Sequence, residues 1–257
     1  MPILITPKAH FEQDVARASA LVAHAVPLPA SDVRNDIMRA AWMMGVGALD
    51  AYFCDAYADL IARTLQAKQI QPSVTIPDRL GNLKVPVHAI IRASANENWR
   101  WRMTARELIE DHTVLSIEKI KTLLNQFFSE DNKLLGESSF DSWVLHREQK
   151  QRLFGTSATA YRATQNQARH QARKSAKEVF QKRYERIFQR RHDCIHNCDR
   201  PKVAVDTSIV TSGEGVNKVL YDISFLVNRC HDALVEHYAS YLADLGFGGV
   251  ARNRVGV

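Results

Sequence analysis

The pattern of apolar and polar positions predicts a chain built mainly from helices. The strongest segment begins after Ser31, which is a suitable N-cap, and its apolar residues recur three and four positions apart on two faces. A helix that is apolar on two faces is typical of the centre of a domain. The two stripes are Ile37, Ala41, Met44, Ala48 and Tyr52, and Trp42, Val46, Leu49, Phe53, Ala56 and Leu60.

Five further helices are indicated by the same periodicity and by residues that start or stop helices. Their expected ranges are Pro7–Val26, Asn96–Asp111, a helix capped by Ser116, Arg169–His196, and Val216–Leu245 ending at Gly246. Prolines, glycines and polar residues predict connections between them. These cover Ile70–Val87, Asp131–Ser142, Gly155–Thr159 and Lys202–Gly215, the last with a strand-like stretch over Val203–Val210.

Together these elements predict an all-α bundle with long central helices and irregular loops. We expect a single helical domain over residues 1–245, with the first, basic and last helices supplying its core. The remaining residues, 246–257, are expected to form a flexible tail.

Composition places the chain among ordinary globular proteins, because 46% of its 257 residues are hydrophobic and 24% are charged. The four cysteines show no small-domain disulfide pattern, so we expect free thiols in a reducing compartment. No export signal or membrane-spanning run of apolar residues is recognisable. These features predict a cytoplasmic protein without a membrane partner.

The net charge of +6 is concentrated in one segment. His146–Lys202 carries 15 Lys and Arg against 5 Asp and Glu, a net charge of +10, which leaves −4 for the rest of the chain. This concentration of positive charge favours an anionic partner, and it favours nucleic acid over a membrane surface. A basic helix that is merely solvated is the competing interpretation.

The candidate chemistry lies near the end of the basic helix, in Gln189–Pro201. Arg191 falls on the apolar stripe of this helix, where a guanidinium needs a partner or a polar cavity because it stays charged. The stripe consists of Phe180, Tyr184, Ile187, Arg191 and Ile195. Asp50, a carboxylate within the apolar central helix, is the acceptor that we expect for Arg191. It could instead face a groove open to water.

Arg191 and His196 are suited to cleaving RNA without a metal. Histidine titrates near neutrality and can move the proton of a 2′-hydroxyl or of the leaving oxygen, while arginine offers a fork of donors to phosphate oxygens. The two residues lie about 140° apart on a regular helix. A homodimer, in which two copies of the motif face each other, would supply two histidines and two arginines.

Other interpretations of this stretch remain open. His192 with His196, and Cys194 with Cys198, are pairs spaced four residues apart that could bind zinc, although a continuous helix places the two pairs on roughly opposite faces. Elsewhere, Trp99–Arg102 could stack bases and contact phosphates, but core packing with surface arginines also explains it. No phosphate-binding glycine loop or nucleophile elbow is present.

The stretch Arg191–His196 resembles the motif of the HEPN superfamily (higher eukaryotes and prokaryotes nucleotide-binding), an arginine followed four to six residues later by histidine. His192 fills the polar position that often follows the arginine. Trp42–Asp59, with its acidic residue in an apolar helix, resembles the core helix of the RiboL-PSP-like branch. The resemblance covers roughly residues 31–245.

This resemblance implies a HEPN-like bundle and a metal-independent endoribonuclease that acts as a homodimer without a cofactor, in a toxin–antitoxin or phage-defence setting with an antitoxin protein as a further partner. Arg191 and His196 would be catalytic, with His192, Asn197 and Asp50 auxiliary. We assign RNA contacts to the neighbouring basic residues, Arg183, Arg186 and Arg190.

Two points qualify the implied function. In the branch paired with nucleotidyltransferase antitoxins, a modified tyrosine follows the histidine by two residues, whereas Cys198 stands here, so that route of control is not expected. HEPN-like domains can also lose activity while keeping fold and dimer. A non-catalytic RNA-binding or assembly module is therefore the alternative.

Overall fold

The computed structural model describes residues 3–82, 84, 101, 102, 105, 109, 114–197 and 212–257. Within these residues the secondary structure is helical and contains no strand, which confirms the predicted all-α class. Within the same residues, no helix is long and apolar enough to cross a membrane.

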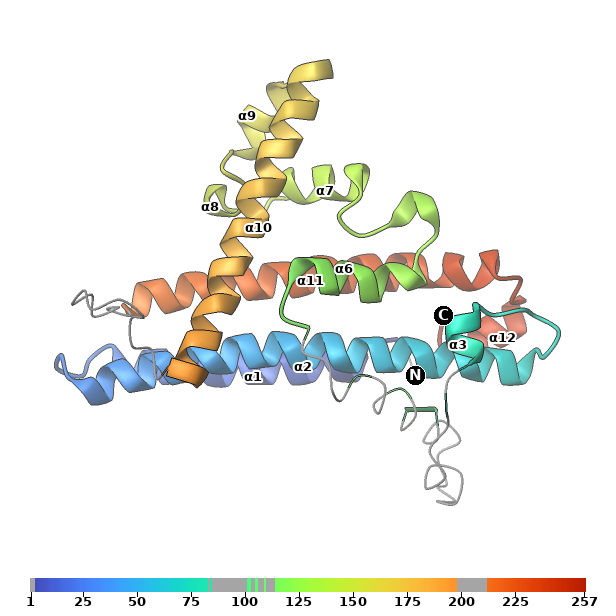
Figure 1. The fold of residues 1–257 in the computed structure, drawn as a ribbon, viewed down its shortest axis with the longest axis horizontal. Helices are drawn as coiled ribbons and strands as arrows, with labels where there is room; N and C mark the ends of the chain where they lie inside the picture. The colour runs from blue at the N-terminus through green and yellow to red at the C-terminus, as the bar shows by residue number, and fades with distance from the viewer. Residues whose placement is uncertain are drawn as a thin grey trace.

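The body of the protein consists of three long helices that lie side by side (Figure 1): α1 (Ile5–Ala25), α2 (Asp32–Ile70) and α11 (Gly213–Asp244). Ser31 caps α2, as its side chain accepts a hydrogen bond from the Arg34 N–H at 3.3 Å. Most residues of the two predicted stripes of α2 are buried, and Ile37, Trp42 and Met44 are half-buried against the core. The prediction that this helix is central is therefore confirmed.

At Gly45, α2 lies close to a side chain of α11. A Cβ atom added there would lie 2.4 Å from Cδ2 of Leu220, a buried residue of α11. The missing side chain thus allows the two helices to pack closely along the middle of the body.

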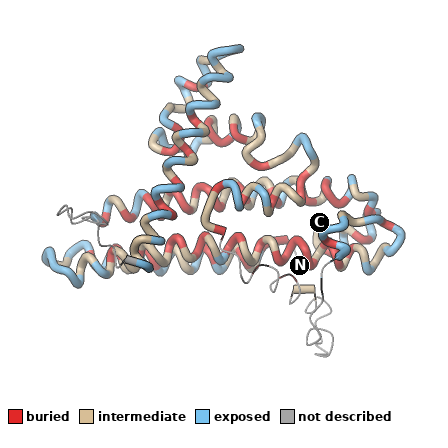
Figure 2. Tube along the Cα trace, in the orientation of Figure 1, coloured by how far each residue is buried: buried red, intermediate tan, exposed pale blue. Residues whose placement is uncertain are grey.

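Helix α10 (Asn166–Asn197) crosses this body (Figure 1). Phe180, Tyr184 and Ile187 of its stripe are buried, so its middle belongs to the core. Its N-terminal end projects beyond the body together with α7 (Glu137–Val144), α8 (Gln151–Phe154) and α9 (Ala158–Ala163), and much of that end is exposed (Figure 2).

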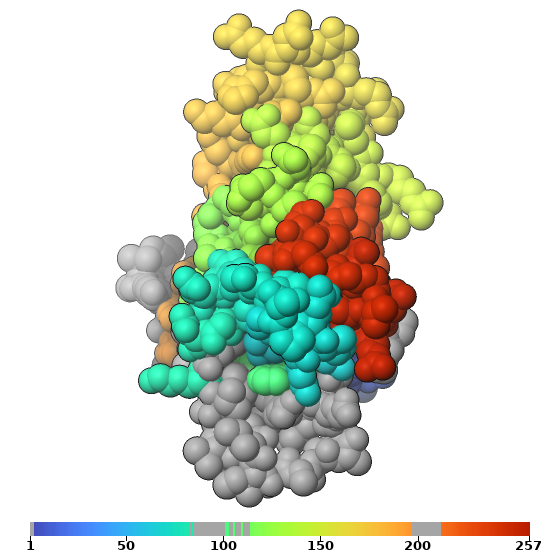
Figure 3. Space-filling model, turned by 90° about the vertical axis from the view of Figure 1, so that its right-hand side faces the viewer, coloured from blue at the N-terminus to red at the C-terminus, as the bar shows by residue number. Residues whose placement is uncertain are grey.

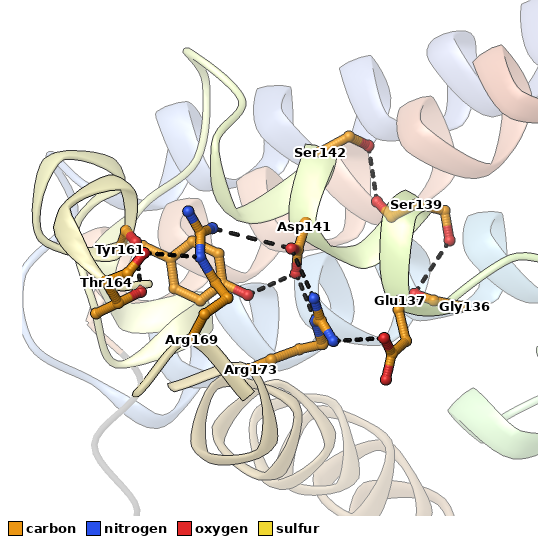
Figure 4. Close-up of polar contacts among 9 residues, drawn as sticks. All are labelled: Gly136, Glu137, Ser139, Asp141, Ser142, Tyr161, Thr164, Arg169 and Arg173. Carbon is orange, nitrogen blue, oxygen red and sulfur yellow. Dashed lines mark hydrogen bonds and ion pairs between the residues drawn. The ribbon is translucent and has the colours of Figure 1, made fainter. Parts of the chain in front are cut away.

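Asp141 ties the projecting helices together (Figure 4). Its carboxylate accepts hydrogen bonds from the Tyr161 hydroxyl at 2.6 Å and from Arg173 Nε at 2.7 Å, and the Arg169 guanidinium lies 4.4 Å from the centre of the Tyr161 ring. Burial opposes ionisation, but the hydrogen bonds from Arg173 and Tyr161 lower the pKa of Asp141 below its ordinary value. The cluster therefore joins α7, α9 and α10 through charge.

Two further aspartates are buried deeper and are also paired with arginines. Asp222 of α11 has no exposed surface and contacts Arg152 Nη2 at 2.7 Å and Arg183 Nε at 2.8 Å. Asp59 of α2 is paired in the same way with Arg63 and Arg102, each at 2.7 Å. Such pairs satisfy carboxylates that would be costly to bury alone.

Short helices complete the described fold. They are α3 (Asp78–Gly81), α6 (Ile117–Leu124), the 3₁₀ helices Asn125–Phe127 and Glu130–Asn132, and α12 (Gly249–Arg254). Ser116 caps α6 as predicted, accepting from the Lys119 N–H at 3.1 Å. Figure 3 shows the end of the body where α3 and the C-terminal part of α2 (cyan) face the C-terminal segment (red).

Two predictions about loops require correction. The expected loop over Asp131–Ser142 contains part of a 3₁₀ helix and most of α7. The expected flexible tail contains α12, whose Ala251 is buried, and Arg63 of α2 donates a hydrogen bond to the carbonyl of the buried Val255. Apolar contacts that are distant in sequence hold this tail on the body.

Some predictions fall on residues outside the described ranges. These are the strand-like Val203–Val210, most of the helix expected over Asn96–Asp111, and Trp99 and Arg100 of the stacking motif. Trp101 is described, and its indole N–H donates to Gln69 Oε1 at 3.2 Å. Arg102 is engaged by Asp59, as described above.

Candidate functional site

The C-terminal half of α10 is fixed on the body by contacts with α2 and α11. The indole N–H of Trp42 donates to the carbonyl of Ile187 at 3.3 Å, and the Arg190 guanidinium lies 5.3 Å from the centre of the Trp42 ring. The Tyr184 hydroxyl donates to the backbone carbonyl of Asp222 at 2.6 Å. These contacts set the rotation of α10 and so decide which side chains face outward.

A cleft of about 500 Å³ lies between the last turns of α10 and the start of α6. Three predicted site residues, Arg191, His192 and His196, meet in its lining. The other lining residues are Leu115, Ser116, Glu185, Phe188 and Gln189. The geometry thus brings the arginine and both histidines of the motif to one cavity within a single chain.

The two histidines form a pair on the open side of the cleft. Their ring centres lie 4.3 Å apart with an angle of 42° between the planes, and both residues are exposed. Arg191 is half-buried and follows Ile187, the last buried residue of the apolar stripe. The stripe ends at Ile195, which is 47% exposed. Along the stripe, Arg191 therefore lies between the buried Ile187 and the exposed Ile195.

Asp50 faces this region from α2. Its carboxylate accepts a hydrogen bond from the Val114 N–H at 2.6 Å. Burial raises the pKa of Asp50, while this hydrogen bond and the positive charges of Arg191 and Lys119 act in the opposite direction. Arg191 therefore acts on the Asp50 carboxylate through its charge, whereas the hydrogen bond comes from the backbone of Val114. The expected direct pairing of Asp50 with Arg191 is not among the contacts of the described residues.

The residues predicted to contact RNA have different surroundings. Arg183 is directed inward, with Nε and Nη2 both 2.8 Å from Oδ2 of the buried Asp222, so it serves to pair that carboxylate. Arg190 lies over the Trp42 ring, as described above. Arg186 is exposed. The RNA contacts assigned to Arg183, Arg186 and Arg190 stay predictions, and for Arg183 such a contact would compete with the pairing to Asp222.

The end of the motif lies at the limit of the described chain. Helix α10 ends at Asn197, whose side chain falls outside the described residues, as do Cys198 and Pro201. The proposed auxiliary role of Asn197 remains a prediction. In the part of the chain that the structure describes, no group of three or more His, Cys, Asp or Glu side chains could hold a metal ion.

Glu185 and Gln189 also line the cleft, although neither was predicted from the sequence. Together with His192 and His196 they recur at steps of four, three and four, which places all four within about 60° on one face of a helix. That spacing could have indicated a shared surface. No comparable sequence pattern indicates that Leu115 and Ser116 line the cleft. Their place in the lining depends on how the start of α6 packs beside α10.

The described fold is all-helical, and an arginine and two histidines of the basic helix α10 line one cleft. Comparison with protein-family models, curated proteins and solved structures finds no match for this chain.

Proposed function

We propose that this protein is a metal-independent endoribonuclease. The observation that carries the proposal is the convergence of Arg191, His192 and His196 in one cleft. The +10 charge of His146–Lys202 supports an anionic substrate.

The proposed reaction is an internal transesterification of RNA. A neutral histidine takes the proton of the 2′-hydroxyl, the 2′-oxygen forms a bond to phosphorus, and the bond from phosphorus to the 5′-oxygen breaks. A protonated histidine then gives its proton to the departing 5′-oxygen. Arg191 donates to the non-bridging oxygens, whose charge grows in the transition state. The products are a 2′,3′-cyclic phosphate and a 5′-hydroxyl.

The acid and the base can come from two copies of the chain. In the proposed homodimer, His196 of each protomer faces the same phosphate across a twofold axis, with His192 orienting its neighbour. The exposed Ile195, one residue before His196, supports an interface beside the site. The proposed setting is a toxin or phage-defence effector, with an antitoxin as a further partner.

Cleavage of labelled single-stranded RNA in EDTA tests this function. The wild-type protein is expected to cut, and Arg191→Ala and His196→Ala to reduce the rate at least about 100-fold, the usual scale for a lost charge-stabilising donor and for a lost acid or base. His170→Ala provides a matched control, because His170 is an exposed histidine near the other end of α10. Equal cleavage by all four proteins would contradict the proposal. RNA binding that weakens with salt, without cleavage, would instead favour the non-catalytic module.

A further inference from the structure

The cleft is chemically divided along α10. Arg191, His192 and His196 occupy one end, whereas the carboxylate of Glu185 occupies the other. Glu185 lies six residues before Arg191, which corresponds to about 9 Å along the helix axis. Among the described residues, the structure assigns Glu185 no ion pair or side-chain hydrogen bond, and the residue is exposed.

Apolar side chains lie beside this carboxylate. Phe188 is 7% exposed, Leu115 is half-buried, and both line the cleft with Glu185. An apolar wall next to a hydrogen-bond acceptor suits a nucleobase, whose faces are apolar and whose edge is polar. The phosphate, in contrast, is favoured at the arginine and disfavoured at the glutamate, so a bound nucleotide has one preferred direction.

We propose that Glu185 is a specificity-determining residue that selects guanine next to the scissile phosphate. A carboxylate offers two acceptor oxygens and no donor. Guanine presents two adjacent donors, N1–H and N2–H, on its Watson–Crick edge, whereas each of the other three bases pairs a donor with an acceptor there. Two parallel hydrogen bonds to a charged acceptor therefore favour guanine. This inference rests on the proposed function, because it uses the same cleft and the same substrate.

Sequencing of the cut ends from a random-sequence RNA pool tests the selection. The wild-type protein is expected to cut beside guanosine at least about tenfold more often than beside other nucleotides, since one good bidentate pair gives this discrimination. Glu185→Gln, which replaces one acceptor by a donor, is expected to lose the preference. Glu178→Gln provides the matched control, because Glu178 is an exposed glutamate on the same face of α10, two turns away and outside the cleft lining.

A second measurement identifies the base edge involved. In a synthetic RNA with one preferred site, inosine in place of guanosine removes N2–H and is expected to lower kcat/KM about tenfold for wild-type protein and Glu178→Gln. Glu185→Gln should show little difference between the two RNAs. No guanosine preference in the wild type, or the same preference in Glu185→Gln, would overturn the inference while leaving the nuclease proposal intact.

If the wild-type protein does not cut RNA, the nuclease proposal fails. The selection of guanine by Glu185 is then tested by measuring RNA binding alone. Fluorescence anisotropy with the guanosine and inosine RNAs then replaces kinetics. Tighter binding of the guanosine RNA by wild type, but not by Glu185→Gln, supports base selection by Glu185. Equal affinities for the two RNAs reject it.

Discussion

Asp50 of α2 lies within electrostatic reach of Arg191 of α10, and the same carboxylate accepts the Val114 N–H at 2.6 Å. Val114 precedes Leu115 and Ser116, which line the cleft. One aspartate therefore contacts the segment that forms one wall of the cleft and acts on the arginine of the other wall. We propose that this arrangement gives Asp50 a positioning role.

Replacement of Asp50 separates its charge from its hydrogen bond. Asp50→Asn keeps an oxygen that can accept the Val114 N–H, so we expect a small change in the free energy of unfolding but slower RNA cleavage, because Arg191 loses a nearby negative charge. Asp50→Ala leaves the N–H without an acceptor and should cost about 1–3 kcal/mol. Urea unfolding and cleavage rates of both variants provide the measurements. Equal unfolding midpoints for the two variants would contradict the hydrogen-bond role.

Asp222 should be the most sensitive ionic position in the described core. Asp222→Asn leaves Arg152 and Arg183 without their shared buried partner, which is expected to destabilise the fold by about 3–5 kcal/mol. Glu214→Gln, which breaks the exposed pair with Lys218 on the same helix, serves as the control and should leave the urea midpoint unchanged. Similar midpoints for both variants would show that the buried pairs contribute little.

His231 should make stability fall at acidic pH. Burial, and then the charge of Lys8, lower the pKa of His231 below its ordinary value of 6.5, while its Nδ1 lies 3.2 Å from the Tyr52 hydroxyl. The unfolded chain then binds more protons than the folded chain, so the contribution of His231 is present above pH 6.5 and is lost as the pH falls toward the lowered value.

Urea unfolding at several pH values between 5 and 7.5 measures this effect. His231→Gln should show a weaker fall in stability toward acid than the wild type. The lowered pKa of His146 adds a fall of the same sign that persists in the variant. An identical pH dependence in the two proteins would exclude His231 as a contributor.

Ile195 tests the proposed dimer. Ile195→Glu places a charge on an exposed apolar side chain beside His196, so we expect a monomer by sedimentation and loss of RNA cleavage with unchanged unfolding of the single chain. Val235→Glu is the matched control, since Val235 of α11 is similarly exposed, at 45% against 47% for Ile195. A dimer that persists in Ile195→Glu would place the interface elsewhere.

The helices that carry the fold could be predicted because their signals are local. The stripe of α2, the stripe of α10 as far as Ile187, the helical range of α11 and the caps at Ser31 and Ser116 depend on residues within a few turns of one another, and the structure confirms them. Helix α12 could not be predicted in this way. It is short, follows glycines, and is held on the body by apolar contacts and by Arg63, which is distant in sequence.

The sequence by itself determined that Arg191 sits on an apolar stripe and that His192 and His196 share a helix face, since both follow from a 3.6-residue turn. The tertiary structure decided which arginines of α10 pair with a buried carboxylate and which line the cleft. Arg183 is as basic as Arg191 and lies on the same helix, yet Asp222, 39 residues away, engages it within the core. Arg191 meets the start of α6 and the charge of Asp50 instead. Pairing between distant segments, which helical periodicity does not encode, therefore separates the arginine that supports the fold from the arginine that lines the cleft.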